Sequence, residues 1–146
     1  MNRVFVVDAS VAAKWLLKED LTDQAIGLLD ETRYELWAPD YILSEVYNVL
    51  CKKVRRRELT ENAALQLAED LAGAPINIRN FIDYLDVAMR LALRHSQAVY
   101  DCIYLAMATQ MGCALVTADQ RFSRAVRQTQ EPMALLTEVV WLGNLG

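Results

Sequence analysis

The sequence predicts an α/β fold with a central parallel sheet and helices on both faces. Short apolar runs alternate with longer amphipathic segments along the whole chain. The first run, residues 4–7, is apolar throughout, which is typical of a strand buried on both faces. No repeat, low-complexity tract or linker interrupts the 146 residues, so we expect a single domain spanning residues 1–146.

The first half of the chain contains two expected strands and four expected helices. The first strand runs directly into Asp8, and a helix follows with Ser10 as its expected N-cap. Pro39 ends the second strand, because proline cannot donate to a sheet. Thr60 and Gly73 are typical residues for the start and the end of a helix. The expected strands are 4–7 and 35–38, and the expected helices are 10–17, 22–29, 41–56 and 60–73.

The second half continues the alternation. Residues 99–111 are apolar nearly all round and end at Gly112, which predicts a buried helix. The expected strands are 76–78, 114–117 and 133–136, the expected helices are 81–94, 99–111 and 122–127, and an apolar tail covers 139–141. Right-handed crossovers with one reversal of winding give about five strands in the order 3-2-1-4-5, in a three-layer arrangement.

Composition excludes several classes of site and location. A formal charge of −4 argues against nonspecific coating of nucleic acid. The single histidine and three cysteines without zinc spacing disfavour His- or Cys-based zinc sites and triads. Cys51 and Cys102 fall in apolar helical patterns, so we expect buried thiols. With no apolar stretch of membrane-spanning length and no signal-peptide pattern, we expect a cytoplasmic protein.

Four acidic residues lie next to strongly apolar segments of the sequence. Asp8 and Asp119 each follow an expected buried strand, Asp101 opens the most apolar helix, and Glu45 borders an apolar helical stripe. Each alone fits an ordinary role in helix capping, helix-dipole stabilisation or solvation. However, ligands of open parallel sheets bind at the carboxyl ends of the strands. If the crevice opens between the first and fourth strands, Asp8 and Asp119 face each other across it.

Carboxylates gathered at one sheet edge repel one another, which raises their pKa values and weakens the fold. A divalent cation removes this conflict, and carboxylates without His or Cys suit Mg²⁺ or Mn²⁺. Such an ion activates water, orients a phosphate and stabilises a departing oxygen. The joint pattern therefore favours phosphodiester hydrolysis.

The acids lie in four short motifs, in chain order: VDAS at 7–10, SEVYNVL at 44–50, YDCIYLAMA at 100–108 and TADQRF at 117–122. With these motifs the chain resembles the PIN domain family over nearly its whole length, and within it the VapC-like toxin ribonucleases. The resemblance implies a PIN-like three-layer fold and an Mg²⁺- or Mn²⁺-dependent endoribonuclease acting on RNA. It also implies the toxin of a type II toxin–antitoxin pair, usually a homodimer, inhibited by a partner antitoxin.

The resemblance also implies roles for individual residues. The four acids would form the catalytic site, with direct metal ligation by Asp8 and Asp101 and direct or water-mediated ligation by Glu45 and Asp119. Three neighbouring side chains would hold the carboxylates or a phosphate, namely Ser10, Asn48 and Thr117. Cys102 stands where the family often has alanine, a change of slight expected effect.

Two basic clusters are candidates for RNA contact. One ends the third helix and contains Lys52, Lys53, Arg55, Arg56 and Arg57; the other follows Asp119 and contains Arg121, Arg124 and Arg127. The first fits cations at a helix C-terminus equally well, and the second begins closer to the acids. Tyrosines and methionines at helical spacing are expected in the core or at an interface, and no aromatic platform for RNA is evident.

Two other functions stay open. A phosphotransfer or phosphatase domain could use Asp8, although a second aspartate two residues later is replaced by Ser10 and no lysine follows Lys53. A noncatalytic PIN-like binding module would keep the fold and lose acids, and the full acidic set argues against it.

Overall fold

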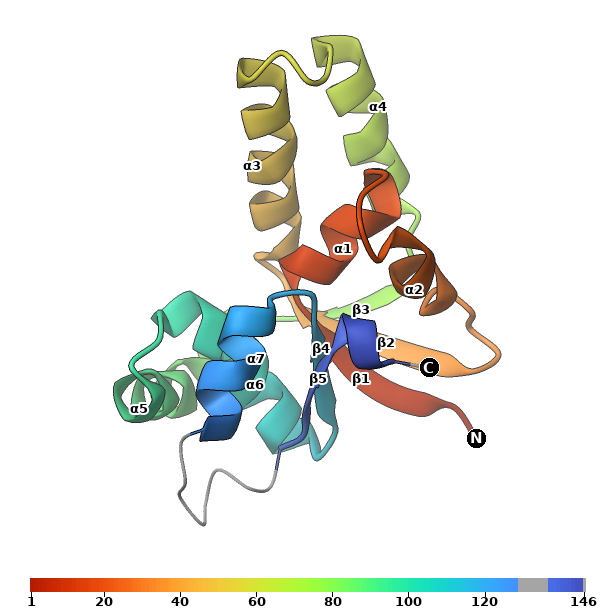
Figure 1. The fold of residues 1–146 in the computed structure, drawn as a ribbon. Coiled ribbons are helices and arrows are strands. Elements are labelled where there is room, and N and C mark those ends of the chain that lie inside the picture. Colours follow the sequence, from red (N-terminus) through yellow and green to blue (C-terminus); the bar gives the residue numbers. More distant parts are fainter. Residues whose placement is uncertain (129–136, 146) are drawn as a thin grey trace.

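The computed structural model describes residues 1–128 and 137–145. Its core is a sheet of five parallel strands in the order β3-β2-β1-β4-β5 (Figure 1). The predicted fold class and strand order are therefore confirmed. The strands are β1 (Arg3–Val7), β2 (Tyr34–Pro39), β3 (Ile76–Arg79), β4 (Ala114–Thr117) and β5 (Val139–Trp141).

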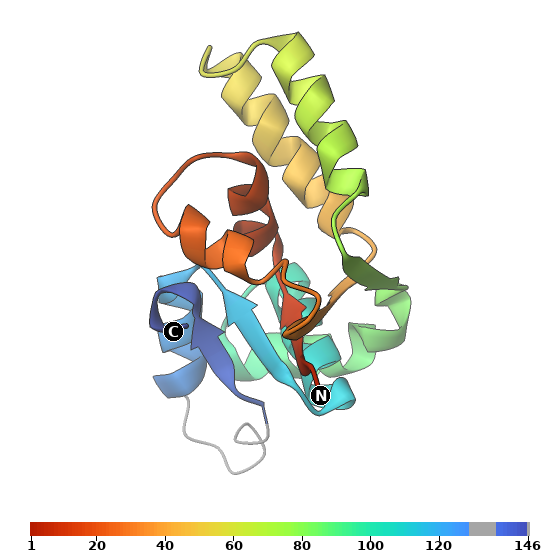
Figure 2. The same ribbon diagram turned by 90° about the vertical axis from the view of Figure 1, so that its right-hand side faces the viewer.

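Helices flank this sheet on both sides. α5 and α6 lie on one side and α1 and α2 on the other (Figure 1), while α3 and α4 form a hairpin that projects beyond the sheet (Figure 2). The helices are α1 (Ala9–Leu16), α2 (Thr22–Gly27), α3 (Ile42–Arg55), α4 (Glu61–Ala72), α5 (Leu85–His95), α6 (Val99–Met111) and α7 (Gln120–Gln128), with 3-10 turns η1 (Phe81–Tyr84) and η3 (Leu142–Asn144).

The central helix is α6, as its composition predicts. Its residues from Cys102 to Ala108 are all buried, and it packs against β1, β2 and β4. An apolar helix surface of this extent is stable only when neighbours cover it on several sides. Gly112 ends α6 with a φ of 66°, the left-handed conformation that glycine adopts without steric cost.

The register of β1 and β4 positions the two strand ends that carry acids. Val7 pairs with Val116, so Asp8 and Thr117 lie next to each other where the two strands leave the sheet. Asp119 follows two residues later, before α7. The carboxyl edge of the sheet therefore gathers the first and last acidic motifs.

Several local expectations are wrong. The N-cap of α1 is Asp8 rather than Ser10. β5 occupies Val139–Trp141, the segment expected to be only an apolar tail. The expected strand at 133–136 lies outside the described residues and stays a prediction. The expected helix at 81–94 begins with a 3-10 turn. Cys102 is buried as expected, but Cys51 is exposed on α3. No described helix has the length and apolar composition to cross a membrane.

Candidate active site

Asp8 links the end of β1 to the start of α1. Its carboxylate oxygen Oδ1 accepts hydrogen bonds from the backbone N–H groups of Ser10, at 3.1 Å, and Val11, at 3.3 Å. These are N–H groups that the first turn of a helix leaves without intrahelical partners. Asp8 is therefore a helix cap, and the capping position holds its carboxylate at the edge of the sheet.

Ser10 and Thr117 hold the same carboxylate from α1 and β4. The Ser10 hydroxyl donates to Asp8 Oδ1 and the Thr117 hydroxyl donates to Oδ2, each at 2.5 Å. In turn, Ser10 Oγ accepts from the N–H of Ala118 at 2.9 Å, and Thr117 Oγ1 accepts from the N–H of Asp119 at 3.0 Å. This network joins the ends of β1 and β4 around one carboxylate.

The other acids come from three more elements. Asp119 caps α7 by accepting the N–H of Phe122 at 3.0 Å. Glu45 lies in the first turn of α3, and its Oε1 accepts a hydrogen bond of 3.1 Å from the hydroxyl of Tyr104. Asp101 lies in the first turn of α6. Three of the four acids therefore have structural contacts of the ordinary kind while lying at one edge of the sheet.

Burial and repulsion by neighbouring acids raise the pKa values of Asp8, Glu45 and Asp101. Burial raises the pKa of Asp8 from 3.8 to about 6, although hydrogen bonds, led by the one from Ser10, oppose the shift. Burial likewise raises the pKa of Glu45 from 4.5 to about 7, against the hydrogen bond from Tyr104. The negative charge of Asp101 adds to both increases.

Asp101 connects the group electrostatically. Burial raises its own pKa, and the negative charge of Asp119 raises it further. Repulsion thus reaches from Asp119 to Asp101 and from Asp101 to Asp8 and Glu45. Repulsion therefore links the four acids, because the charges of Asp8, Asp101 and Asp119 each raise the pKa of another member of the set.

An open cavity of about 370 Å³ adjoins this set. Glu45 and Asp119 line it, together with Ser10 and with Lys14 and Glu19, which form an ion pair of 3.8 Å. Asp8 and Asp101 are not among its lining residues. The cavity therefore gives direct access to Glu45 and Asp119. Ser10, whose hydroxyl is hydrogen-bonded to Asp8, also lines it.

The donor set fits a hard divalent cation. All of the acidic groups offer oxygen, their repulsion would be relieved by positive charge, and Mg²⁺ commonly binds one or two carboxylates while keeping several waters. Among the described residues, no three His, Cys, Asp or Glu side chains surround a common point. The site thus fits an ion held by few direct ligands better than one enclosed by four carboxylates.

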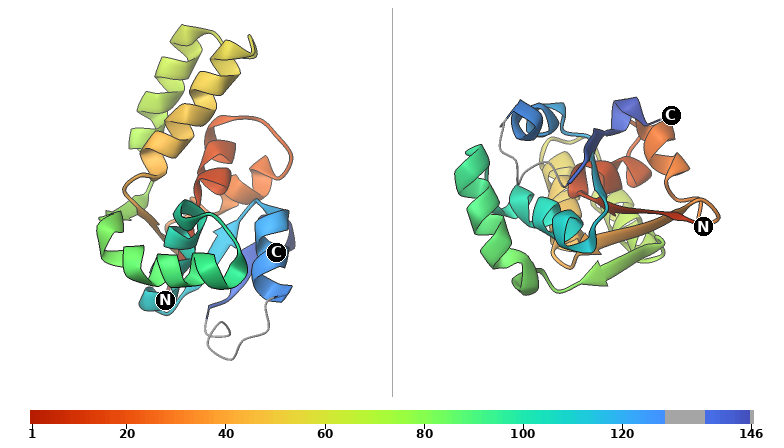
Figure 3. Two further views of the ribbon diagram at one scale, coloured as in Figure 1. Left: turned by 90° about the vertical axis from the view of Figure 1, so that its left-hand side faces the viewer. Right: turned by 90° about the horizontal axis from the view of Figure 1, so that it is seen from below.

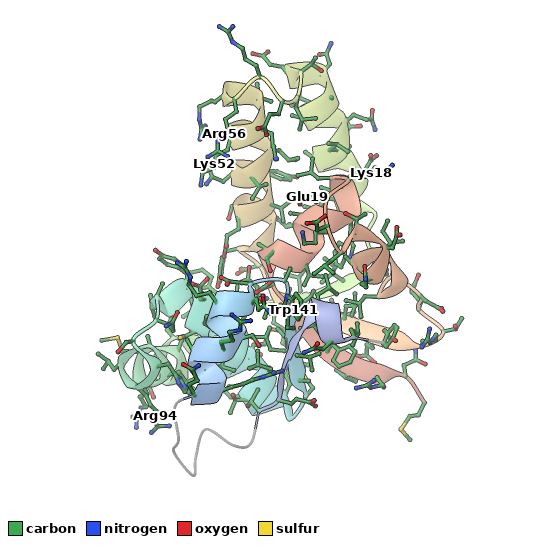
Figure 4. All side chains as sticks on the ribbon, viewed as in Figure 1. Lys18, Glu19, Lys52, Arg56, Arg94 and Trp141 are labelled. Carbon is green, nitrogen blue, oxygen red and sulfur yellow. The ribbon has the colours of Figure 1, made fainter. Side chains whose placement is uncertain are left out.

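The remaining predicted residues are spread more widely. Asn48 is exposed on α3, one turn beyond Glu45. Lys52 is exposed, whereas Lys53 forms an ion pair with Glu58 at 3.0 Å. Figure 4 shows Lys52 and Arg56 together on the outer side of α3, away from the sheet.

The arginines of α7 also differ in their contacts. Arg121 and Arg124 are exposed. Arg127 instead donates from Nε to the carbonyl of Val139 at 3.1 Å, which ties α7 to β5. Arg127 therefore has a structural contact that its spacing with the other two arginines did not indicate.

Tyr104 is a site residue that sequence reasoning assigned only to the core or an interface. It is 2% exposed, in agreement with a core position, but its hydroxyl reaches Glu45. Tyr41 packs edge-on against it, with ring centroids 5.3 Å apart. A usable signal was present, because Tyr104 follows Asp101 by three residues and so lies on the same helical face.

The fold and site together define an α/β protein with a coupled acidic cluster at the carboxyl edge of an open parallel sheet. The PIN domain family matches residues 5–128. Ribonuclease VapC3 of Pyrobaculum aerophilum is 33% identical over 120 residues, which cover 81% of this chain and 91% of the relative. The chain belongs to the PIN domain family.

Solved structures show the same fold at lower identity. VapC20 of Mycobacterium tuberculosis, a toxin that cleaves the sarcin–ricin loop, has a TM-score of 0.63 at 19% identity, covering 83% of this chain and 94% of that one. The DNA-bound VapBC of Salmonella typhimurium has a TM-score of 0.63 at 14% identity, covering 97% and 99%.

The raised pKa of Asp8 predicts a pH dependence of folding stability. The folded state binds the Asp8 proton more tightly than the unfolded chain does, so stability is lost as pH rises from about 4 through about 6. With chelator present, the free energy of unfolding of the unmodified protein should fall by about 2 kcal/mol more between pH 4.5 and 7 than that of Asp8→Asn.

Urea unfolding followed by circular dichroism measures this difference. Asp23→Asn, an exposed change in α2, is the matched control and should retain the pH dependence of the unmodified protein. Parallel pH profiles for Asp8→Asn and the unmodified protein would contradict the account.

Proposed function

We propose that this protein is a metal-dependent endoribonuclease, the toxin of a type II toxin–antitoxin pair. The observation that carries the proposal is the coupled acidic set, whose burial and repulsion raise the pKa values of Asp8, Glu45 and Asp101 at an accessible edge of the sheet. A stable fold gains nothing from such repulsion, whereas a bound cation benefits from it. Family membership and the likeness to Ribonuclease VapC3 support RNA as the substrate.

In this proposal Asp8 and Asp101 hold Mg²⁺ or Mn²⁺, and Glu45 and Asp119 ligate directly or through water. When bound, such an ion supplies positive charge to phosphate oxygens and makes a water molecule more acidic. Ser10 and Thr117 keep the Asp8 carboxylate in one orientation, since each donates to a different oxygen. Tyr104 orients Glu45 through its hydroxyl, which leaves the other Glu45 oxygen available to orient a water or accept its proton.

The substrate backbone would leave the site along α3. Glu45, Lys52 and Arg56 recur at intervals of seven and four residues, so they share one face of the helix. Lys52 lies about 10 Å along the helix from Glu45, at a rise of about 1.5 Å per residue. Asn48 lies between them on the same face, and the exposed Arg121 and Arg124 offer a second contact from α7.

The proposed partners are an antitoxin and a second copy of the chain, in the cytoplasm. The Salmonella typhimurium relative of this fold is a VapBC assembly, which supports an antitoxin partner. A free toxin with an intact acidic site would be harmful to its own cell, so a tight inhibitory partner is required by the proposed activity.

Cleavage of total RNA by the purified protein tests the proposal. With Mn²⁺ the unmodified protein should cut RNA at discrete positions, and Asp101→Asn should lower the rate by roughly a hundredfold or more, because loss of metal stabilisation costs several kcal/mol. Asp23→Asn provides a matched Asp-to-Asn change far from the site. Cleavage by Asp101→Asn at the rate of the control, or cleavage in excess chelator, would overturn the assignment.

Two adjacent lysines test the RNA path along α3. Lys52→Ala should weaken RNA binding and reduce the salt dependence of the binding constant by about one released ion. Lys53→Ala is the matched control, because Lys53 points to another face and already pairs with Glu58. Fluorescence anisotropy at several salt concentrations measures both, and equal effects of the two changes would refute this path.

A further inference from the structure

The cavity beside the acids has one basic side chain in its wall. Lys14 of α1 is the one lysine or arginine among the described residues that line this cavity of about 370 Å³. Glu45 and Asp119, two of the four acids, line the same cavity. The acidic set alone does not explain why a positive charge lies in the same wall.

Helix α1 fixes the position of this lysine relative to the acids. Ser10 and Lys14 are four residues apart, so they share one face of the helix and lie about 6 Å apart along its axis. Asp8 caps this helix and accepts the hydroxyl of Ser10. α1 packs against α3, and the two helices lie side by side in two further views (Figure 3). Lys14 therefore belongs to the α1 side of the cavity, whereas Glu45 belongs to the α3 side.

Lys14 is paired with Glu19 and not with the four acids. Its Nζ lies 3.8 Å from Glu19 Oε1, and the exposed fractions of the two side chains are 15% and 36%. Glu19 follows α1 and is labelled in Figure 4. The charges that shift the pKa values of Asp8, Glu45 and Asp101 are all those of other acids. The ammonium group thus lies in the cavity wall without neutralising the acidic set.

The ion pair with Glu19 is a weak reason for a lysine at this position. A partly exposed pair at this distance contributes little to folding stability. A lysine ammonium is a compact charge with three donors, and it binds phosphate oxygens well. Its partial burial in a cavity wall is better explained by an anion that enters the cavity.

We infer that Lys14 binds a backbone phosphate of RNA inside this cavity, and that Glu19 holds the ammonium group until the phosphate replaces it. The inference takes its substrate class from the proposed function. It makes Lys14 a substrate-binding residue and leaves the role of the four acids unchanged.

This contact answers an electrostatic difficulty of the site. A phosphate that enters the cavity meets three lining carboxylates, those of Glu19, Glu45 and Asp119. Lys14 supplies attraction at the same place, which favours entry of a negatively charged strand. Lys52 lies outside this cavity on the outer side of α3, so the two lysines would bind different phosphates.

Fluorescence anisotropy with a labelled single-stranded RNA tests the contact. Every protein carries Asp101→Asn and the buffer contains chelator, so that the RNA stays intact and the site is less negative. Lys14→Met should weaken binding about threefold or more, and it should reduce the slope of log K against log salt by about 0.7, the value for one phosphate on a single strand. Lys14→Arg keeps the charge and should keep the slope.

Lys18→Met is the matched control. Lys18 is exposed, follows Lys14 by four residues and is not among the residues that line the cavity. Its replacement should leave the slope unchanged. Lys14→Gln provides a second neutral variant, and circular dichroism verifies that each protein is folded.

The role of Glu19 is tested by a double-mutant cycle. With Lys14 present, Glu19→Gln should tighten RNA binding about two- to threefold, because the phosphate no longer competes with a carboxylate for the ammonium group. In the Lys14→Met background the same change should have a smaller effect. Equal effects in the two backgrounds would contradict the exchange of Glu19 for a phosphate.

The outcomes separate this inference from the nuclease assignment. Equal salt slopes for Lys14→Met and Lys18→Met would overturn the phosphate contact, even if the unmodified protein cleaves RNA with Mn²⁺. A reduced slope for Lys14→Met in a protein that does not cleave RNA would support the contact and remove the nuclease function. Failure of the Asp101→Asn protein to bind RNA at low salt would overturn the contact.

Discussion

The rest of the site depends on the half-buried carboxylate of Asp8. It caps α1, and the hydroxyls of Ser10 and Thr117 hold its two oxygens, so it joins the ends of β1 and β4. Partial loss of hydration makes a charge in this position costly, and the raised pKa of Asp8, about 6, expresses that cost. The structure tolerates it because hydrogen bonds to both oxygens compensate part of the lost hydration. What remains uncompensated is negative charge, which is the property that a cation site needs.

The neighbouring acids likewise combine a structural contact with a candidate role in the site. Asp119 caps α7, and Glu45 accepts the hydroxyl of Tyr104, so each functional candidate also has a local structural contact. These contacts fix orientation without neutralising charge. The fold therefore supplies a rigid frame for repelling groups, and Asp101 transmits the repulsion among them. A structural role and a role in metal binding are compatible in one side chain, because a hydrogen-bonded carboxylate keeps its negative charge.

The sequence predicted the sheet order and the placement of acids at strand ends because both follow from alternating patterns and crossover handedness. The prediction of Ser10 as the N-cap of α1 was wrong, because serine and aspartate both cap helices and the choice depends on the residue at which β1 ends. Sequence reasoning missed the contact of Tyr104 with Glu45 because a core tyrosine and a site tyrosine have the same periodicity. It also missed the anchoring of β5 by Arg127, which joins segments that only the folded chain brings together. Long-range contacts of single polar atoms leave no local pattern.

The central claim is that the acids form one electrostatically coupled cation site. Because Asp8 and Glu45 have pKa values of about 6 and 7, the site holds protons near pH 6 that a bound cation must displace. Calorimetric titration of the protein with Mn²⁺ at pH 6, in two buffers of different ionisation enthalpy, measures this displacement directly. The account predicts net proton release at pH 6 that declines toward pH 8. Binding without proton release at pH 6, or no binding at either pH, would contradict it.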